Sequence, residues 1–593
     1  MSRWLAGSLR HSRAALEALV GEASRGSTRV GPLGLAWSGP APGRFGTARC
    51  LLDGRVHGLS ALRESLGVSP DVGPEAILAA GYRRHGEALL PGLRGDFVLV
   101  LWDVHTETAV VARDQLGARP LFVYGSGEPI AFASEVRQLL HLLTSRPAPR
   151  PAAVQAWLRS GAPAPGTTLY EGVEPLAPAG RLRLDGGRLD RGRYWWPRYR
   201  EPLPMSRAEA VEAIREGARA AVGRALDGHR KVGVLLSGGL DSGSVASLAE
   251  PLARRAGIEL TAYSAVFPDH PELDESALIQ LQARRLGLGG VHRAVRGGSP
   301  LRAALSFLRE WELPPGPPAH FVWAPLVRLA AQHGCTCLVD GEGGDELFGA
   351  AQHLMADRLL QGRPLTALRL ARASPGIGHG AGPRLLAETV RDFGLAPLGA
   401  ALRRRDAPLW WRRLAESVIA SPDALGLFDY YRRRGEAAGV APRHPFLDLE
   451  LIELVLRIPP ELAFDPVFTR PLLREAMAGL VPDEVRLRRG KSYFDRLLRD
   501  ALVERDLPLA RTLLAGAAEV QAYADPGRAV GLLRDGGEAR HPRGSVGWTR
   551  DVWRLLTAEC WLRMQSNRDV IERLVAPRSR IPRFSSMATA GYT

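Results

Sequence analysis

Residues 231–242 read KVGVLLSGGLDS and decide the fold of the larger part of this chain. The first six, KVGVLL, are a continuous apolar run that predicts a buried strand. The next six are Ser237, Gly238, Gly239, Leu240, Asp241 and Ser242, and a helix is expected over 243–255. Two glycines let the backbone turn tightly with its N–H groups pointing inward, and the two serines add hydroxyl donors. Since a helix N-terminus adds positive potential, this loop is predicted to cradle a pyrophosphate.

Strands and helices continue to alternate beyond this loop. ELTAYSAVF (259–267) is the next predicted strand, a helix is expected near 274–286, and CTCLVD (335–340) is the third strand. Buried strands that alternate with helices indicate a parallel α/β sheet, whose ligands bind at the carboxyl ends of the strands. The loop at 237–242 lacks the Gly-Lys-Ser/Thr of a Walker motif, which disfavours a kinase or motor acting on a γ-phosphate.

A second loop follows the third strand and is acidic. It reads Asp340, Gly341, Glu342, Gly343, Gly344, Asp345 and Glu346. Carboxylates beside a phosphate site would repel the ligand unless a cation bridged them, so Asp241 and Asp345 are predicted to bind Mg²⁺ through oxygen donors. A solvated acidic turn that caps the next helix is the alternative. Two such loops at adjacent strand ends disfavour it.

The regions on either side differ in composition. Residues 1 to about 200 are predicted to be β-rich, because GDFVLVLWD (95–103) and TAVVARD (108–114) form a hairpin pattern. The Pro-rich stretch 144–166 contains a short helical piece and is predicted to be a connector on the surface. The chain beyond about 347 is expected to be mostly helical. Within it, the Arg-rich, aromatic segment 384–415 could dock a peptide or partner, but a solvated face over an ordinary core is favoured.

Composition narrows the class of protein. The 593 residues suggest two to four domains, and 45% apolar with 24% charged residues is typical of globular proteins. Lysine plus arginine is 78 against 63 acids, a net charge of +15 without long like-charge blocks. This favours acidic partners or substrates over nucleic acid. Four cysteines exclude a disulfide scaffold, and Cys335 and Cys337 are interpreted as core residues. No apolar run approaches the ~18 residues of a membrane span, so no membrane role and a cytoplasmic location are expected.

Lysine is almost absent from this chain. Only Lys231 and Lys491 occur, and the other 76 of the 78 basic residues are arginine. A GC-rich genome explains the excess of arginine. A lysine that remains under this bias marks a position where a compact point charge with a tunable pKa is needed. That argument is weak for Lys231, which lies beside Arg230, and stronger for Lys491.

These motifs resemble the asparagine synthetase superfamily, whose ATP-pyrophosphatase domain carries SGGLDS and a GEGxDE-like loop. GDFVLVLWD, RDQLGARPLF and FASE resemble its N-terminal glutaminase domain, and RHPFLD (443–448) resembles its RxPFLD element. The resemblance covers almost the whole chain. It implies an α+β, glutaminase-like (Ntn-type) domain over 1–200. It also implies an α/β ATP-pyrophosphatase (PP-loop, adenine nucleotide alpha hydrolase-like) synthetase domain with a helical C-terminal extension over 201–593.

The resemblance also implies a reaction. A substrate carboxylate attacks the α-phosphate of ATP, magnesium pyrophosphate leaves, and an amine displaces AMP to form an amide. RGKSYF matches Lys491 to the family's active-site lysine, which would stabilise charge on the phosphate and on the tetrahedral intermediate. Glu342 matches the catalytic glutamate, which would steer the amine, take its proton, or only organise the metal shell. The residues implied to line the adenine and ribose site are Leu235, Ala265, Asp340 and Gly341.

Two departures concern the glutaminase half. A working glutaminase needs a cysteine directly after the initiator methionine, whereas this chain begins Met1, Ser2, Arg3. A serine hydroxyl is far less acidic than a thiol and is a poor substitute. The NGEIYN element reads DGRVHG at 53–58, which loses the asparagine that helps hold the oxyanion. The N-terminal domain is therefore predicted to be degenerate, and the amine must arrive with the substrate.

Two subfamilies are implied by that combination: β-lactam synthetases and the macrolactam synthetases that close lasso peptides. Three features favour a peptide substrate. The synthetase half is large, and the surface is basic. The third is Glu342, because β-lactam synthetases look to carry tyrosine at the matching position. The expected partners are a precursor peptide and, with it, a leader peptidase and a peptide-recognition protein. Alternatives are a β-lactam-type small-molecule cyclase, an ammonia-dependent asparagine synthetase, an inactive scaffold and a nucleic-acid modifier. The glutaminase-like half disfavours the last.

Overall fold

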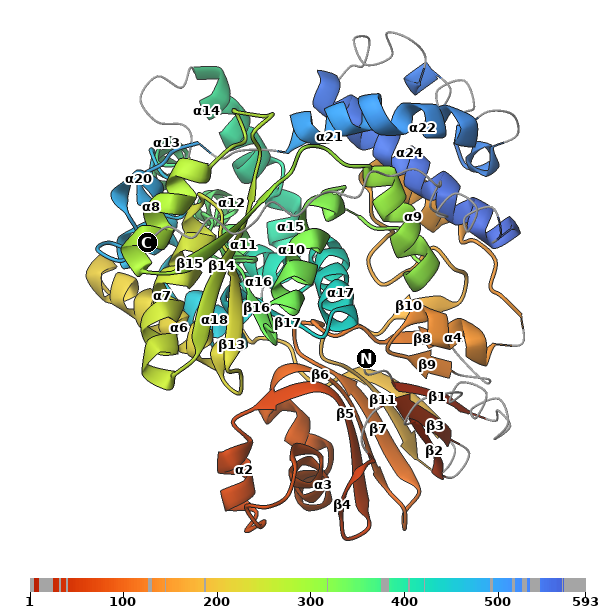
Figure 1. Ribbon diagram of the computed structural model, residues 1–593. Coiled ribbons are helices and arrows are strands. Elements are labelled where there is room, and N and C mark those ends of the chain that lie inside the picture. Colours follow the sequence, from red (N-terminus) through yellow and green to blue (C-terminus); the bar gives the residue numbers. More distant parts are fainter. Residues whose placement is uncertain are drawn as a thin grey trace.

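The N-terminal part of the chain folds into two stacked antiparallel sheets (Figure 1). The computed structural model describes residues 5–9, 25–30, 33–38, 41–125, 131–143, 145–185, 188–316, 318–374, 383–403, 406–420, 422–490, 494–514, 518–524, 531–533, 544–567 and 569. One six-stranded sheet has the order β10 (Val173–Pro175), β8 (Phe122–Tyr124), β9 (Ala131–Ala133), β1 (Leu5–Leu9), β3 (Leu33–Ser38) and β2 (Arg25–Val30). The other has the order β12 (Arg188–Arg193), β11 (Gly180–Asp185), β7 (Thr108–Arg113), β6 (Arg94–Asp103), β5 (Ala48–His57) and β4 (Gly43–Phe45).

Strand β6 shows why this domain has four layers. Val98 and Val100 point into the core between the two sheets, while Phe97, Leu99 and Leu101 pack with residues of α3 (Pro74–His85) on the opposite face. Both faces of the strand are buried, which explains its uninterrupted apolar run. Helix α4 (Val136–Leu142) packs behind β8 and β9, so each sheet carries a helix on its outer face. The predicted hairpin is confirmed as β6 paired with β7, and the Ntn-type fold is confirmed with it.

The second domain is built on a five-stranded parallel sheet. Its order is β15 (Gly289–Ala294), β14 (Glu259–Val266), β13 (Lys231–Leu235), β16 (Cys337–Val339) and β17 (Ala441–Arg443). The flanking helices are α6 (Arg207–Leu226), α7 (Leu240–Ala256), α8 (Ser276–Leu286), α9 (Pro300–Trp311) and α10 (His320–Gln332). The chain adds strands on one side of β13 and then returns to the other, so the order reverses between β13 and β16. Ligands of such sheets bind at this switch point.

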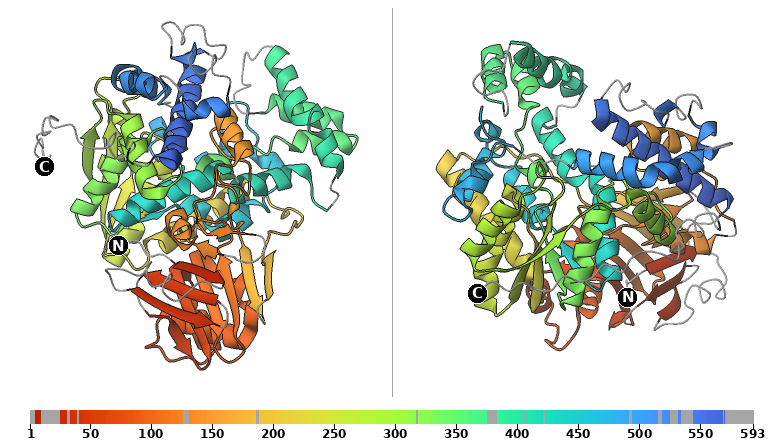
Figure 2. Two further views of the ribbon diagram at one scale, coloured as in Figure 1. Left: turned by 90° about the vertical axis from the view of Figure 1, so that its right-hand side faces the viewer. Right: turned by 45° about the horizontal axis from the view of Figure 1, so that its top comes forward.

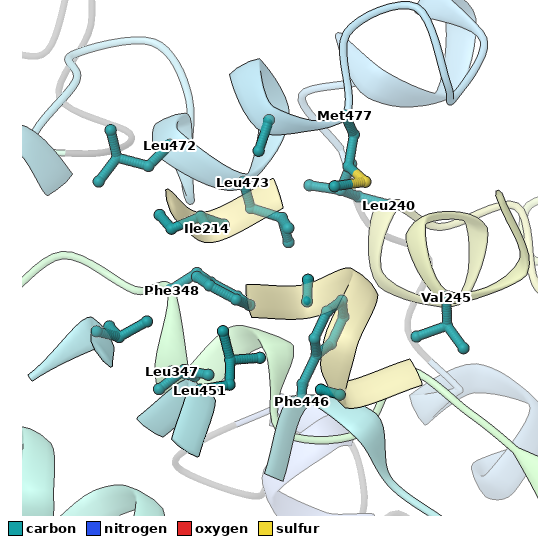
Figure 3. Close-up of a cluster of buried hydrophobic side chains, with 14 of the residues drawn as sticks. Ile214, Leu240, Val245, Leu347, Phe348, Phe446, Leu451, Leu472, Leu473 and Met477 are labelled. Carbon is teal, nitrogen blue, oxygen red and sulfur yellow. The ribbon is translucent and has the colours of Figure 1, made fainter. Parts of the chain in front are cut away.

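A single apolar cluster anchors the loops at the switch point (Figure 3). Leu240 is the first residue of α7, directly after the loop that follows β13, Leu347 comes from α11 (Gly344–Leu347) and Phe446 from η3 (Pro445–Leu447). Each is at most 4% exposed. The apolar residue inside each polar motif therefore fixes the loop to the core, and the polar residues beside it are left at the surface of the cavity.

The rest of the chain is helical, as expected. It comprises α12 (Leu354–Leu360), α13 (Pro364–Arg372), α14 (Pro383–Val390), η2 (Arg391–Leu395), α15 (Leu398–Arg403), α16 (Leu409–Ile419), α17 (Pro422–Ala437), α18 (Leu449–Val455), η4 (Pro460–Ala463), α19 (Pro471–Ala476), α20 (Asp483–Arg486), α21 (Asp495–Ala501), η5 (Leu502–Asp506), α22 (Leu507–Leu514), η6 (Glu519–Ala522) and α24 (Gly544–Ser566). The helices from α12 to α15 form a lobe that projects from the molecule (Figure 2). Trp410 and Trp411 of the aromatic segment are buried in the synthetase core, in agreement with the favoured interpretation.

The Pro-rich connector contains a short helix, as predicted, and most of its described residues are exposed or half-buried. Its helix α5 (Pro151–Ser160) is packed against α24, and Trp157, which is 5% exposed, donates a hydrogen bond to Thr557 Oγ1 at 3.1 Å. Proline and glycine around the helix concealed the apolar face formed by Ala153, Val154 and Trp157. Cys335 and Cys337 are buried, as predicted. Within the part of the chain that the structure describes, no helix is long and apolar enough to cross a membrane.

Candidate active site

The two predicted loops meet at the carboxyl ends of β13 and β16 and enclose a cavity of about 400 Å³. Every predicted site residue among the described ranges lines this cavity: Leu235, Ser237, Gly238, Gly239, Asp241, Ser242, Ala265, Asp340, Gly341, Glu342 and Asp345. The loops touch through glycine. A Cβ on Gly341 would lie 2.6 Å from the backbone of Asp241 and of Ser242. Only a residue without a side chain allows this approach.

Hydroxyl groups hold the first loop in shape. The backbone N–H of Ser237 donates to Ser242 Oγ at 3.1 Å, and that of Gly239 donates to Ser237 Oγ at 3.2 Å. The N–H of Gly238 donates to Glu275 Oε2 at 2.9 Å, and Glu275 also pairs with Arg488 at 2.5 Å. All three of these backbone amides therefore donate to side chains of the protein, and one acceptor, Glu275, is a carboxylate that the sequence analysis did not single out.

Asp241 and Asp345, the predicted Mg²⁺ ligands, are brought together. Arg470 Nη1 forms an ion pair with Asp241 and lies 2.9 Å from Asp345 Oδ1. A Cβ on Gly344 would fall 2.5 Å from Asp241 Oδ1, so the backbone leaves space at this carboxylate only because residue 344 is glycine. Two carboxylates with hard oxygen donors suit Mg²⁺, which usually completes its shell with phosphate and water. The described ranges contain no group of three or more metal-ligating side chains.

Asp340 is held by two donors. It is 7% exposed, and its Oδ1 accepts from the backbone N–H of Glu342 at 3.1 Å and lies 2.8 Å from His444 Nδ1. Burial by itself would lower the pKa of His444, but the negative charges of Asp340, Glu342 and Asp96 outweigh it and raise that pKa above its usual value. A more basic imidazole favours the form that donates to Asp340.

Glu342 is paired with a tyrosine. Tyr431 is 7% exposed and forms a side-chain hydrogen bond with Glu342. Burial and the charge of Glu342 raise the pKa of Tyr431, so the phenol stays protonated and donates to the carboxylate. The wall beside this pair is aromatic, with the rings of Phe267 and Trp323 packed 5.5 Å and 6.0 Å from the ring of Phe494.

Two predicted features lie outside the described residues. Lys491 is the first, and its role stays a prediction, although Gly490 and Phe494 on either side of this part of the chain line the cavity. Ser2, at the expected place of the glutaminase nucleophile, is the second.

Asp53, which matches the first asparagine of the family's NGEIYN element, lies within the described residues and forms an ion pair. Asp53 is 3% exposed and lies 2.7 Å from Arg119 Nη1, and the same guanidinium atom lies 2.7 Å from Glu436 Oε1 of α17. Burial raises the pKa of Asp53 to about 6, against the opposing charge of Arg119. A carboxylate therefore stands where the family has an amide, and it is neutralised by an arginine that bridges to the synthetase domain.

Comparison with known proteins agrees with this geometry. Residues 213–563, more than half of the chain, match the family model for asparagine synthase, and residues 35–195 match that for a glutamine amidotransferase domain. A Mycobacterium bovis protein named "Putative asparagine synthetase (glutamine-hydrolyzing)" is 26% identical over 92% of this chain and 88% of its own. The glutamine-hydrolysing asparagine synthetase 1 of Bacillus subtilis is 23% identical over 86% and 84%. The amidase chry2 of Gibberella zeae is 25% identical over 70% and 72%.

The match of the family model, the two loops at the switch point and the stacked N-terminal sheets lead to one assignment. Members of this family use ATP, commonly with Mg²⁺. The chain belongs to the asparagine synthase family and is an asparagine synthetase-like, ATP-dependent carbon–nitrogen ligase.

Proposed function

We propose that this ligase is a macrolactam synthetase of the lasso-peptide type. It activates an Asp or Glu side-chain carboxylate of a precursor peptide and joins it to the N-terminal amine of the same peptide. The observation that carries the proposal is the engaged Asp53, which pairs with Arg119 where a glutaminase would keep an asparagine for its oxyanion. An oxyanion site altered in this way would leave the enzyme without its own source of ammonia. The amine must then belong to the substrate.

The reaction balances with the groups available. The substrate carboxylate bonds to the α-phosphorus of ATP and pyrophosphate leaves; the amine then bonds to the acyl carbon, AMP leaves, and the amine loses a proton. In this scheme the loop at 237–242 binds the pyrophosphate, and Lys491 stabilises charge at the phosphorus and the acyl carbon. Glu342, oriented by Tyr431, accepts the proton of the amine.

Asp241 and Asp345 would hold Mg²⁺, which when bound offsets charge on the departing pyrophosphate. The two side chains are already close to one another because Arg470 contacts both. The role of the two aspartates would be to hold the positive charge of Mg²⁺ next to the loop that binds the pyrophosphate.

Several features support a peptide as the substrate. The net charge of +15 attracts a substrate with carboxylates, and the aromatic wall of Phe267, Trp323 and Phe494 offers apolar contact to amino-acid side chains. A leader peptidase and a peptide-recognition protein are proposed as partners on the same ground, since the precursor must be trimmed to expose its amine.

A small-molecule cyclase of the β-lactam synthetase type is the second candidate. The observation in its favour is the volume of the cavity, about 400 Å³, which lies near the lower end of the ~300–1,000 Å³ usual for small-molecule sites. Such a cavity holds a nucleotide with a small substrate more readily than with a folded peptide. Neither candidate needs a glutaminase, because in both the amine is part of the substrate.

Mass spectrometry tests whether this ligase closes a peptide. The full chain is incubated with ATP, Mg²⁺ and a synthetic peptide that has a free N-terminus and one internal Asp or Glu. Loss of one water from the peptide, with AMP and pyrophosphate released, is expected. The N-acetylated peptide should still support ATP–pyrophosphate exchange and should lose no water, because its amine is blocked. Asparagine formed from aspartate and ammonium, with no change to any peptide, would overturn the proposal.

A further inference from the structure

We infer that the glutaminase-like domain positions the acidic loop 340–346 of the synthetase through two connected arms of side-chain contacts. This inference does not depend on which carboxylate the enzyme activates. Pairing of charged groups across a boundary can fix geometry even where it adds little stability. Both arms begin on charged residues of the N-terminal domain, Asp96 on β6 and Arg119 in the loop between β7 and β8, and end on Asp340 or Glu342.

The first arm, the β17 arm, starts at Asp96 on β6. Asp96 Oδ2 accepts from Arg443 Nη1 at 2.6 Å, and both side chains are largely buried. Burial by itself would raise the pKa of Asp96, but Arg443 and Arg119 outweigh it and lower that pKa, which keeps the ion pair charged. Arg443 ends β17, and its carbonyl accepts from the N–H of Asp340 at 3.2 Å. The next residue, His444, lies 2.8 Å from the Asp340 carboxylate. Asp96 is thus two contacts from the acidic loop.

The second arm, the α17 arm, starts at Arg119. Its Nη1 lies 2.7 Å from Asp53 in its own domain and 2.7 Å from Glu436 of α17. Glu436 is further held by Arg432, one helical turn earlier, at 2.7 Å. On the same helix Tyr431 forms its hydrogen bond with Glu342. Displacing Glu436 would therefore move the phenol that orients Glu342.

The two arms touch each other close to the loop. The rings of Tyr431 and His444 lie 5.9 Å apart at an interplanar angle of 49°. Asp96 also lies 3.8 Å from Arg119, so the arms are joined at their origin as well. A closed circuit of contacts resists distortion more than either arm alone. This gives a degenerate domain a continuing role, because its polar residues set the positions of two carboxylates in the ATP cavity.

The chain provides a matched control on the same boundary. Arg55 of β5 donates to the carbonyl of Asp227 at 2.6 Å, at the end of α6. This contact also joins the two domains. Arg55 lies opposite Asp96 in the pairing of β5 with β6, but among the described residues neither Arg55 nor Asp227 forms a hydrogen bond or ion pair with β17, α17 or the acidic loop.

The test uses four full-length variants: Asp96→Asn, Asp96→Glu, Glu436→Gln and the control Arg55→Gln. Two quantities are measured: backbone hydrogen exchange of peptides spanning 337–346, and the Kd for the Mg²⁺ complex of α,β-methylene-ATP. We expect Asp96→Asn and Glu436→Gln to speed exchange in the loop and weaken nucleotide binding by about tenfold, the size typical of residues coupled through contact. Asp96→Glu, which keeps the charge, should recover part of the loss, and Arg55→Gln should match the wild type within about twofold.

The inference is overturned if Asp96→Asn and Glu436→Gln change loop exchange and Kd no more than Arg55→Gln does. It is also overturned if exchange rises equally in β5 and β6, because that is the result of a general loss of domain contact. If Asp96→Asn lowers the unfolding temperature too far for binding to be measured, Asp96→Glu and Glu436→Gln decide by the same two readouts.

Discussion

Gly341→Ala tests whether the two loops pack as closely as the structure shows. The added Cβ would lie 2.6 Å from the carbonyl carbon of Asp241 and from the nitrogen of Ser242, whereas ordinary contact begins at 3.4 Å. The loops must therefore separate by roughly 0.8 Å, and since both obstructing atoms belong to the backbone, no side-chain rotation relieves the clash. Overpacking of this kind costs about 1–3 kcal/mol.

This cost should appear in nucleotide binding, because the loops that must separate form the pyrophosphate and metal side of the cavity. A loss of about 1–3 kcal/mol corresponds to a Kd for the Mg²⁺ complex of α,β-methylene-ATP that is about 5- to 150-fold higher, measurable by calorimetry. Gly289→Ala is the control, since its Cβ would meet no atom within 4 Å. If Gly341→Ala binds the nucleotide within about twofold of Gly289→Ala at the same unfolding temperature, the packing argument is wrong.

Three further predictions concern single side chains. Lys491→Ala and Lys491→Arg should both abolish AMP formation with the unfolding temperature unchanged, because the wide fork of arginine cannot replace a compact charge, and full activity in either contradicts the role. Asp345→Asn should raise the Mg²⁺ concentration for half-maximal AMP formation by at least about tenfold, and an unchanged magnesium titration would exclude this residue as a ligand. The raised pKa of His444 stabilises the fold below the unfolded-state pKa of about 6.5, and this is lost as pH rises through the higher folded-state pKa. The free energy of unfolding should therefore fall more steeply in the wild type than in His444→Gln as pH rises above about 6.5, as followed by urea denaturation.

The switch-point loops were predictable because their signal is local. Strand, Gly-rich turn and helix follow one another within 26 residues at 231–256, and the cavity then forms where two such units are neighbours in the sheet. The residues that hold the loops in place were not predicted. His444 is 104 residues from Asp340 and Tyr431 is 89 residues from Glu342, and only the pairing of β16 with β17 and the packing of α17 bring them together.

Strand β17 shows why the longer-range pairing had no sequence signal. It is three residues long, Ala441–Arg443, and its central residue is proline, which normally argues against a strand. The structure places β17 at the edge of the sheet, where a missing N–H is tolerated. Arg470 was not predicted for a different reason. One arginine among 76 forms no sequence pattern, and its left-handed φ of 55° is visible only in the structure.

The acidic loop explains why such distant partners are needed. Asp241, Asp340, Glu342 and Asp345 line one cavity, and like charges at these separations oppose one another. Each carboxylate has a partner from another part of the chain: Arg470 for the two aspartates of the metal site, His444 for Asp340 and Tyr431 for Glu342. The sequence of the loop places the carboxylates close enough to repel one another. The partners from the surrounding elements offset that repulsion and hold each carboxylate in position. Since two of these partners are connected to Asp96 and Arg119, the N-terminal domain contributes to the geometry of the ATP cavity whether or not it hydrolyses glutamine.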